Sequence, residues 1–194
     1  MNKNLITLQT DSKLTISKTK SLLALKNKLI PKKKNELVDD SWVERLWAWA
    51  DENDISKEKL PRNKEKLLNL KELYLCDNQI TELPKEIGNL MNLAMLDCWS
   101  TQITELPKEI GNLTNLAVLS FRDNQITELP KEIGNLTNLI CLALSNNPNL
   151  ILTQEQKEWM NNLERNDCSI YIDDDLLDRI DISEIYISED EIPF

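Results

Sequence analysis

The chain contains no histidine, and only three of its 194 residues are glycine. Without histidine, neither a Ser-His nor a Cys-His nucleophile can form, and the commonest metal ligand is missing. Three glycines are too few for the glycine-rich loops that hold nucleotide phosphates. We therefore expect a chain that is not an enzyme and that carries no catalytic residue, metal ion or cofactor.

Cysteines and long apolar runs are also scarce. Cys76, Cys98, Cys141 and Cys168 follow neither a C-x-x-C pattern nor a metal-ligand spacing. No stretch approaches the roughly 18 apolar residues of a membrane-spanning helix, and no signal-peptide pattern is apparent. We expect reduced thiols and a cytoplasmic protein without a membrane span. Export into a host cell by a pathway without a cleaved signal stays open.

Acidic residues outnumber basic residues, and the formal net charge is −10. The charge is uneven, because nine lysines lie within residues 1–35 and thirteen carboxylates lie within residues 153–194. Binding to phosphates requires a basic groove. We therefore do not expect nucleic acid to be a partner.

One motif occupies the middle of the chain and repeats every 23 residues. Near-identical units begin at Leu70, Leu93 and Leu116, and a truncated fourth unit begins at Leu139. The first half of each unit, L-x-x-L-x-L, alternates apolar and polar residues, which predicts a strand with one buried face. Stacked parallel strands lie about 4.8 Å apart. The second leucine of the motif should therefore form one buried column, made of Leu73, Leu96, Leu119 and Leu142.

The second half of each unit, I-T-E-L-P-K-E-I-G-N-L, leads the chain to the next strand. Its proline restricts a turn, and its glycine can adopt a positive φ. The asparagine after the strand (Asn78, Asn124 and Asn147) should bond neighbouring backbone groups, because a buried amide needs partners. Thr101 replaces it in the second unit, where we expect a weaker ladder of bonds.

The motif L-x-x-L-x-L-x-x-N-x-I-x-x-L-P-x-x-I-G-x-L resembles the bacterial leucine-rich repeats of 23 residues. It is also similar to the cytoplasmic Ras-related leucine-rich repeat group. The resemblance covers about residues 60–150 and implies an α/β fold: a short right-handed solenoid with a parallel concave sheet and helical caps at both ends. It further implies an interaction scaffold whose concave sheet binds other proteins. Some bacterial members act as effectors inside host cells.

The ends of a solenoid must be covered, because its terminal repeats expose apolar surface. A helix near residues 40–53, with Val43, Leu46, Trp47 and Ala50 on one face, is expected at the first end. At the other end, Thr153 and Gln156 form a capping-box pattern before a helix, and a strand follows at residues 169–172.

The chain divides into five expected segments on these patterns. They are a poorly defined basic N-terminal segment at 1–35, an N-terminal helical cap and half-repeat at 36–69, leucine-rich repeats at 70–152, a C-terminal cap at 153–172 and an acidic tail at 173–194. The aspartates within 173–181 lack the D-x-[DN]-x-[DN]-G loop of a calcium site, so we assign them to the tail.

The positions expected to face solvent on the strands differ between units, whereas the rest of the motif hardly changes. Such variation on one face indicates that specificity lies there. We therefore expect an unidentified partner protein to bind at Tyr74, Met95, Asp97, Trp99, Val118, Ser120, Arg122 and Asp123.

Trp99 beside Arg122 is the most informative pair of this set. An exposed tryptophan flanked by arginine and methionine has the composition of a protein-binding hot spot. The other interpretation is that Trp99 only packs over its neighbours on the sheet, stacked under the guanidinium of Arg122.

Two further questions stay open at this point. The alternative to a binding module is an enzyme, or a fragment of one, with its active residues in the unassigned termini. A bacterial effector acting on host signalling is a further alternative. We also expect either a monomer or weak self-association through a C-terminal strand, because Ile185-Tyr186-Ile187 repeats the sequence Ile170-Tyr171-Ile172.

Overall fold

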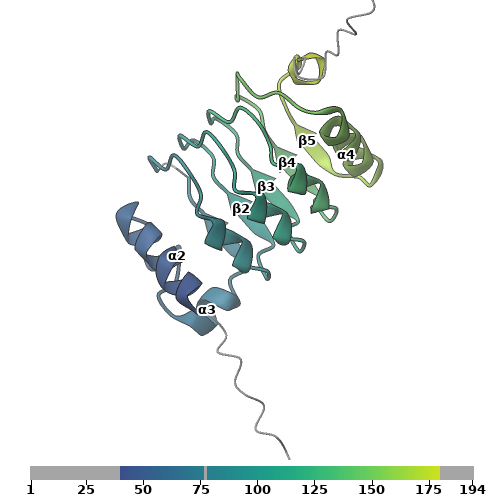
Figure 1. Ribbon diagram of the computed structural model, residues 1–194. Helices are drawn as coiled ribbons and strands as arrows, with labels where there is room; N and C mark the ends of the chain where they lie inside the picture. Colours follow the sequence, from purple (N-terminus) through teal and green to yellow (C-terminus); the bar gives the residue numbers. More distant parts are fainter. Residues whose placement is uncertain (1–39, 77, 180–194) are drawn as a thin grey trace, which may run out of the picture. The chain divides into compact units, whose positions relative to one another are not determined.

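The computed structural model describes residues 40–76 and 78–179 of the chain (Figure 1). The chain separates into two units, Met1–Asp40 and Ser41–Phe194, and nearly all described residues belong to the second. The basic N-terminal segment at residues 1–35 and the second Ile-Tyr-Ile sequence at residues 185–187 lie outside the described residues.

Five short parallel strands form one sheet in the order β1-β2-β3-β4-β5. The first four come from successive repeats, and the fifth comes from the segment after them. Leu73, Leu96 and Leu119 pair in register with one another and then with Leu142, and all four are fully buried. The expected leucine column is therefore confirmed. The strand bounds are Glu72–Tyr74, Met95–Asp97, Val118–Ser120, Cys141–Ala143 and Ser169–Tyr171.

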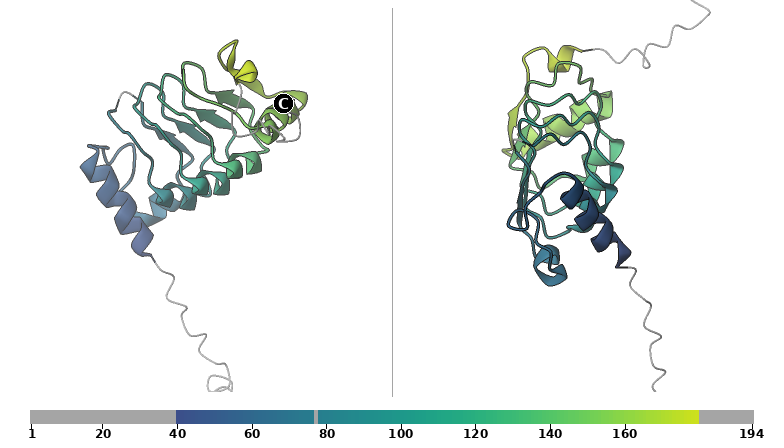
Figure 2. Two further views of the ribbon diagram at one scale, coloured as in Figure 1. Left: turned by 45° about the horizontal axis from the view of Figure 1, so that its top comes forward. Right: turned by 90° about the vertical axis from the view of Figure 1, so that its left-hand side faces the viewer.

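The opposite side of the solenoid consists of three stacked 3₁₀ helices, visible as a row of short coils in Figure 2. They are η1 (Lys85–Asn89), η2 (Lys108–Asn112) and η3 (Lys131–Asn135). Each begins directly after the proline of its repeat, because proline fixes φ and has no N–H to leave unsatisfied. The tight 3₁₀ geometry suits a connection of only a few residues between stacked strands.

None of the three repeat glycines adopts the positive φ that glycine permits. Gly88 is required by close packing instead. A Cβ atom at Gly88 would lie 2.4 Å from the carbonyl oxygen of Glu109 in the next 3₁₀ helix, and one at Gly111 would lie 2.3 Å from that of Glu132. No atom lies within 4 Å of the corresponding position on Gly134. Glycine therefore lets successive 3₁₀ helices approach closely, which is a steric role.

Positive φ values occur at the turns that follow β2, β3 and β4. Ser100, Asp123 and Asn146, one residue before the ladder position of their units, have φ values of 54°, 57° and 60°. Aspartate and asparagine tolerate this left-handed conformation better than most residues. The turn is thus built by short polar side chains, which leaves those side chains at the rim of the sheet.

The asparagine ladder forms as expected from the second unit to the fourth. Asn124 donates to the carbonyls of Cys98 and Phe121 and accepts from the amide of Ile103, and Asn147 repeats this pattern one unit later. Thr101 contributes only its hydroxyl, which lies 2.5 Å from Oδ1 of Asn124 and 3.2 Å from the carbonyl oxygen of Cys98. Every buried side-chain polar atom of the described residues has a hydrogen-bond partner.

A second asparagine ladder, which the sequence analysis missed, joins the units at the opposite end of the strands. Asn92, Asn115 and Asn138 each donate to a carbonyl 24 residues earlier, at 2.7 to 2.8 Å. The third and fourth repeats are therefore tied to the preceding repeat by asparagines at both ends of the strand, and the second repeat is tied by Asn92 at one end.

Helix α2 (Ser41–Glu52) packs against η1 at the first end of the solenoid. Its buried residues include Trp49, whereas Trp47 is half-buried and donates its indole N–H to the carbonyl of Pro61. Trp47 had been expected on the buried face; its polar N–H keeps it at the boundary, where a partner is available. Arg45 crosses to Glu86 of η1 with an Nε–Oε1 distance of 2.6 Å. A short helix, α3 (Lys64–Leu68), leads into β1.

Helix α4 (Gln154–Arg165) packs against η3 and β5 at the other end. The predicted capping box is present: Thr153 accepts from the amide of Gln156, and the Gln156 side chain accepts from the amide of Thr153. The Gln156 amide group also donates to the buried carbonyl of Leu129 at 2.8 Å, which ties the helix to the third repeat.

The described part of the acidic tail expected at residues 173–194, which ends at Arg179, is folded. A 3₁₀ turn, η4 (Leu176–Asp178), buries Leu176 completely. Arg179 then donates to the carbonyls of Asn147 and Leu150 and pairs with Asp173 and Asp175. The sequence analysis did not identify these contacts, because a single arginine makes them within a stretch of alternating acidic and apolar residues. None of the described helices is long and apolar enough to cross a membrane.

Candidate binding face

The solvent side of the sheet, called the concave face below, consists of two rows of side chains in register. One row contains Glu72, Met95, Val118, Cys141 and Ser169, and the next contains Tyr74, Asp97, Ser120, Ala143 and Tyr171. Neighbouring members of a row are about 4.8 Å apart because each lies on an adjacent parallel strand. The face therefore spans about 19 Å from β1 to β5.

The eight residues expected to bind a partner lie on this face or at its rim. Tyr74, Trp99 and Arg122 are exposed, and the other five are half-buried. Tyr74 and Trp99 expose 42% and 43% of their surface, although large aromatic side chains are usually removed from water. The face thus combines half-buried small and aliphatic residues with exposed rings above them.

Trp99 is held by a polar network at the rim. Its indole N–H donates to Oδ2 of Asp123 at 2.5 Å, and its backbone N–H donates to Oδ1 of Asp97 at 3.1 Å. Asn146 donates to the other oxygen of Asp123 at 2.6 Å, and Nε of Arg122 lies 3.1 Å from Oδ2. Trp99 and Arg122 are therefore linked through the carboxylate of Asp123.

Asp123 lies at the centre of this network, and its pKa is lowered. The hydrogen bonds from Asn146 and Trp99 are the main causes, and the nearby charge of Arg122 contributes further. All three favour the ionised carboxylate, which accepts hydrogen bonds without donating any. The network consequently holds its geometry throughout the neutral pH range.

The network continues toward the C-terminal end of the chain. Asn146 donates its backbone N–H to Oδ1 of Asp173 at 2.8 Å, and Asp173 pairs with Arg179. A continuous set of polar contacts therefore runs along one rim of the concave face from Trp99 to Arg179.

Tyr171 is a residue of this face that the sequence analysis missed. It exposes 58% of its surface and lies beside Ala143 in the row that begins with Tyr74. The 23-residue period did not identify it because it follows Ala143 by 28 residues, after helix α4. The available signal was Ile-Tyr-Ile, a short alternating strand pattern with the tyrosine on the polar side.

The four cysteines are free thiols. Burial raises the pKa of each one, and the negative charge of Asp97 raises the pKa of Cys76, Cys98 and Cys141 further. A raised pKa leaves the thiol protonated, whereas the thiolate is the nucleophile. The surroundings of all four cysteines therefore favour the protonated thiol.

Residues 40–76 and 78–179 contain no cluster of three or more Cys, Asp or Glu residues that could hold a metal ion. Asp173 and Asp175, members of the acidic stretch, are paired with Arg179. The guanidinium of Arg179 therefore occupies the carboxylates that a metal cation would have to bind.

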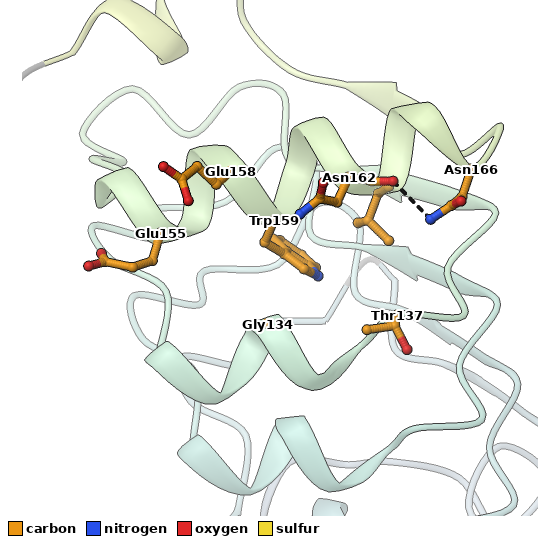
Figure 3. A pocket seen from close by; sticks show the side chains of 8 residues that line it. Gly134, Thr137, Glu155, Glu158, Trp159, Asn162 and Asn166 are labelled. Atoms are coloured by element: carbon orange, nitrogen blue, oxygen red, sulfur yellow. Dashed lines mark hydrogen bonds between the residues drawn. The ribbon is translucent and has the colours of Figure 1, made fainter.

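A separate groove of about 260 Å³ lies on the other side of the solenoid, between η3 and α4 (Figure 3). Trp159 lies beneath the helix and faces Gly134, and its indole N–H donates to the carbonyl of Leu136. The groove exists because α4 does not approach Gly134 as closely as a further 3₁₀ helix would. Glu155, Glu158 and Asn162 line its outer part.

Comparisons with known proteins agree with this architecture. A model of the leucine-rich repeat region matches residues 96–165, and a model of two leucine-rich repeat copies matches residues 68–113. The comparison with curated proteins gave no match.

Three solved structures illustrate the similarity. A leucine-rich repeat protein from Leptospira interrogans is 44% identical, with a TM-score of 0.46, over 54% of this chain and 26% of that one. The internalin InlF from Listeria monocytogenes is 27% identical, with a TM-score of 0.44, over 56% and 31%. The ectodomain of the Arabidopsis thaliana receptor kinase GASSHO1/SCHENGEN3, in complex with CASPARIAN STRIP INTEGRITY FACTOR 2, is 26% identical, with a TM-score of 0.38, over 55% and 15%.

The chain spans less than a third of each of these solved chains. The matched models, the 23-residue motif and the in-register parallel sheet lead to one identification: residues 68–165 are a leucine-rich repeat region, folded as a short α/β solenoid.

Proposed function

We propose that this chain is a non-enzymatic interaction module that binds a partner protein through its concave face. Leucine-rich repeat regions generally mediate contacts between proteins. The residues proposed to bind are Tyr74, Met95, Asp97, Trp99, Val118, Ser120, Arg122 and Asp123, together with Tyr171.

One observation carries this proposal: Trp99 is exposed and is held in place. A free tryptophan side chain loses rotamer freedom when it binds, and this loss lowers affinity. The hydrogen bond between Trp99 and Asp123 fixes the ring before any partner arrives. A fixed aromatic ring surrounded by half-buried residues has the properties of a hot-spot residue.

The experiment is a binding measurement with variants of the complete chain. Trp99→Ala should weaken binding to a partner at least tenfold, because truncation of a hot-spot residue typically costs more than ~2 kcal/mol. Met91→Ala is the matched control, since Met91 is also a large, exposed apolar residue but precedes the strand, away from the concave face. Equal affinity of Trp99→Ala and Met91→Ala for the partner would refute the proposal.

Cytoplasmic location belongs to the same proposal and depends on the similarity to the Ras-related repeat group. An effector that acts on host signalling would use the same face. Fractionation of cells that express the chain distinguishes the two, because an effector must be recovered outside the cell that makes it.

Self-association is a second proposed interaction, and the free edge of β5 favours it. Among the described strands, β5 pairs only with β4, so one edge remains able to pair with another strand. Sedimentation at increasing concentration tests this proposal, and a monomer at all concentrations would refute it.

A further inference from the structure

The concave face carries carboxylates that no described basic residue neutralises. Among the described residues of the four repeats, Glu72, Asp97 and Asp123 are its acidic residues, and Arg122 is its basic residue. Arg122 pairs with Asp123. Within the described part of the chain, neither Glu72 nor Asp97 lies within 4.0 Å of a lysine or arginine nitrogen. The region over β1 and β2 is therefore negative.

The two unpaired carboxylates have hydrogen bonds that orient them without removing their charge. Oε2 of Glu72 accepts from the hydroxyl of Tyr74 at 3.0 Å, and Oδ1 of Asp97 accepts from the amide of Trp99 at 3.1 Å. Both donors are neutral, so each carboxylate keeps its full charge and at least one further acceptor position.

The negative potential extends over the face. The pKa of Tyr74 is raised, first by its hydrogen bond to Glu72 and further by the charges of Glu72 and Asp97. Burial raises the pKa of the Cys141 thiol, and the charge of Asp97 adds to the effect although Cys141 lies two strands away. A cation approaching this face is attracted over the same distances.

Aromatic rings adjoin the carboxylates. Tyr74 pairs directly with Asp97 across β1 and β2, and Trp99 follows Asp97 by two residues. Lysine and arginine side chains bind well where a carboxylate neutralises the charged end and an aromatic face contacts the cation or its stem. Phosphate groups and acidic peptides are disfavoured by the same charges.

We infer that the partner presents a lysine or arginine side chain to Asp97 and Glu72, next to the rings of Tyr74 and Trp99. This inference rests on the proposed function and specifies the partner as a basic segment of a protein. The distance between the end strands of the face, β1 and β5, is about 19 Å and accommodates about six residues of extended chain. The rest of such a segment would lie over Val118, Ser120 and Tyr171.

The test is selection of a random peptide library, displayed on phage, against the complete chain. The wild-type protein should enrich peptides that contain lysine or arginine. The double variant Glu72→Gln/Asp97→Asn keeps both hydrogen-bond acceptors and removes both charges, so it should bind a selected peptide about five- to tenfold more weakly. The control Glu82→Gln/Glu105→Gln removes two exposed charges elsewhere and should bind the peptide as the wild type does.

The outcomes separate this inference from the proposed function. Peptides that lack basic residues but require Trp99 would overturn the inference and leave the concave face as the binding surface. Equal affinity of the two double variants for a basic peptide would overturn it as well. A selection in which no peptide depends on Trp99 would overturn both proposals.

Discussion

At the scale of single residues, three glycines in an identical local sequence have different surroundings. Each belongs to K-E-I-G-N, yet a Cβ atom would collide with backbone at Gly88 and Gly111 and would meet no atom at Gly134. The sequence places all three at the same phase and gives no reason to distinguish them. The difference arises from what packs against each one, a 3₁₀ helix in two cases and helix α4 in the third.

The glycines give the first prediction. Gly111→Ala should destabilise the protein by roughly 2 to 3 kcal/mol, because a methyl group cannot fit against the carbonyl of Glu132 without moving the backbone. Gly134→Ala should be neutral or stabilising by up to about 1 kcal/mol, since alanine reduces the entropy of the unfolded chain. Urea unfolding measures both. Equal losses would show that the 3₁₀ helices are not packed as described.

A second prediction concerns Asp123. Because its pKa is lower in the folded protein than in the unfolded chain, its contribution to stability is present above the ordinary carboxyl pKa of 3.8 and is lost as the pH falls through the lowered value. The indole N–H signal of Trp99 should therefore hold its position down to about pH 4 and shift below it. In Asp123→Asn this shift should be absent. A Trp99 signal that titrates between pH 5 and 7 would contradict the assignment.

At the scale of elements, the regular part of the chain was predictable and the irregular part was not. The leucine column and the capping box of α4 follow from local spacing, so the sequence analysis identified both. Tyr171 and Arg179 follow helix α4 and do not share the repeat phase. Their positions depend on how α4 and the chain after it return to the solenoid, which no local pattern specifies.

Thr101 gives an element-scale prediction about the asparagine ladder. Asn124 and Asn147 each donate to a carbonyl 26 residues earlier, and the threonine hydroxyl cannot reach that far. Thr101→Asn should restore this bond, to the carbonyl of Leu75, and raise stability by about 1 kcal/mol. Thermal unfolding tests it. A lower melting temperature would mean that the second unit is not equivalent to the third.

Helix α4 gives another prediction, because the side chain of Gln156 stabilises it through two separate hydrogen bonds. Gln156 completes the capping box and also bonds the buried carbonyl of Leu129. Gln156→Ala should cost about 2 kcal/mol, since it removes a cap and leaves a buried acceptor without its partner. Glu158→Ala, at an exposed position of the same helix, is the control and should have little effect. A similar loss for both variants in denaturant unfolding would exclude this role of Gln156.

At the scale of the whole chain, the solenoid separates its two tasks in space. The leucine column, the 3₁₀ helices and the two asparagine ladders hold the repeats together, and none of these features requires the side chains of the concave face. Those side chains can therefore differ between repeats without affecting the stack. Along the row from Tyr74 to Tyr171, the side chains differ in size, charge and polarity from one strand to the next.

Hydroxyl-radical footprinting of the complete chain, with and without a bound partner protein, tests most directly whether the concave face is the binding surface. Tyr74, Trp99 and Tyr171 are exposed, aromatic and readily oxidised, and Met91 serves as an exposed reference away from the face. We expect binding to reduce oxidation of the three aromatic residues severalfold and to leave that of Met91 unchanged. Protection of Met91, with the three aromatic residues still oxidised at the rate of the free chain, would contradict the account.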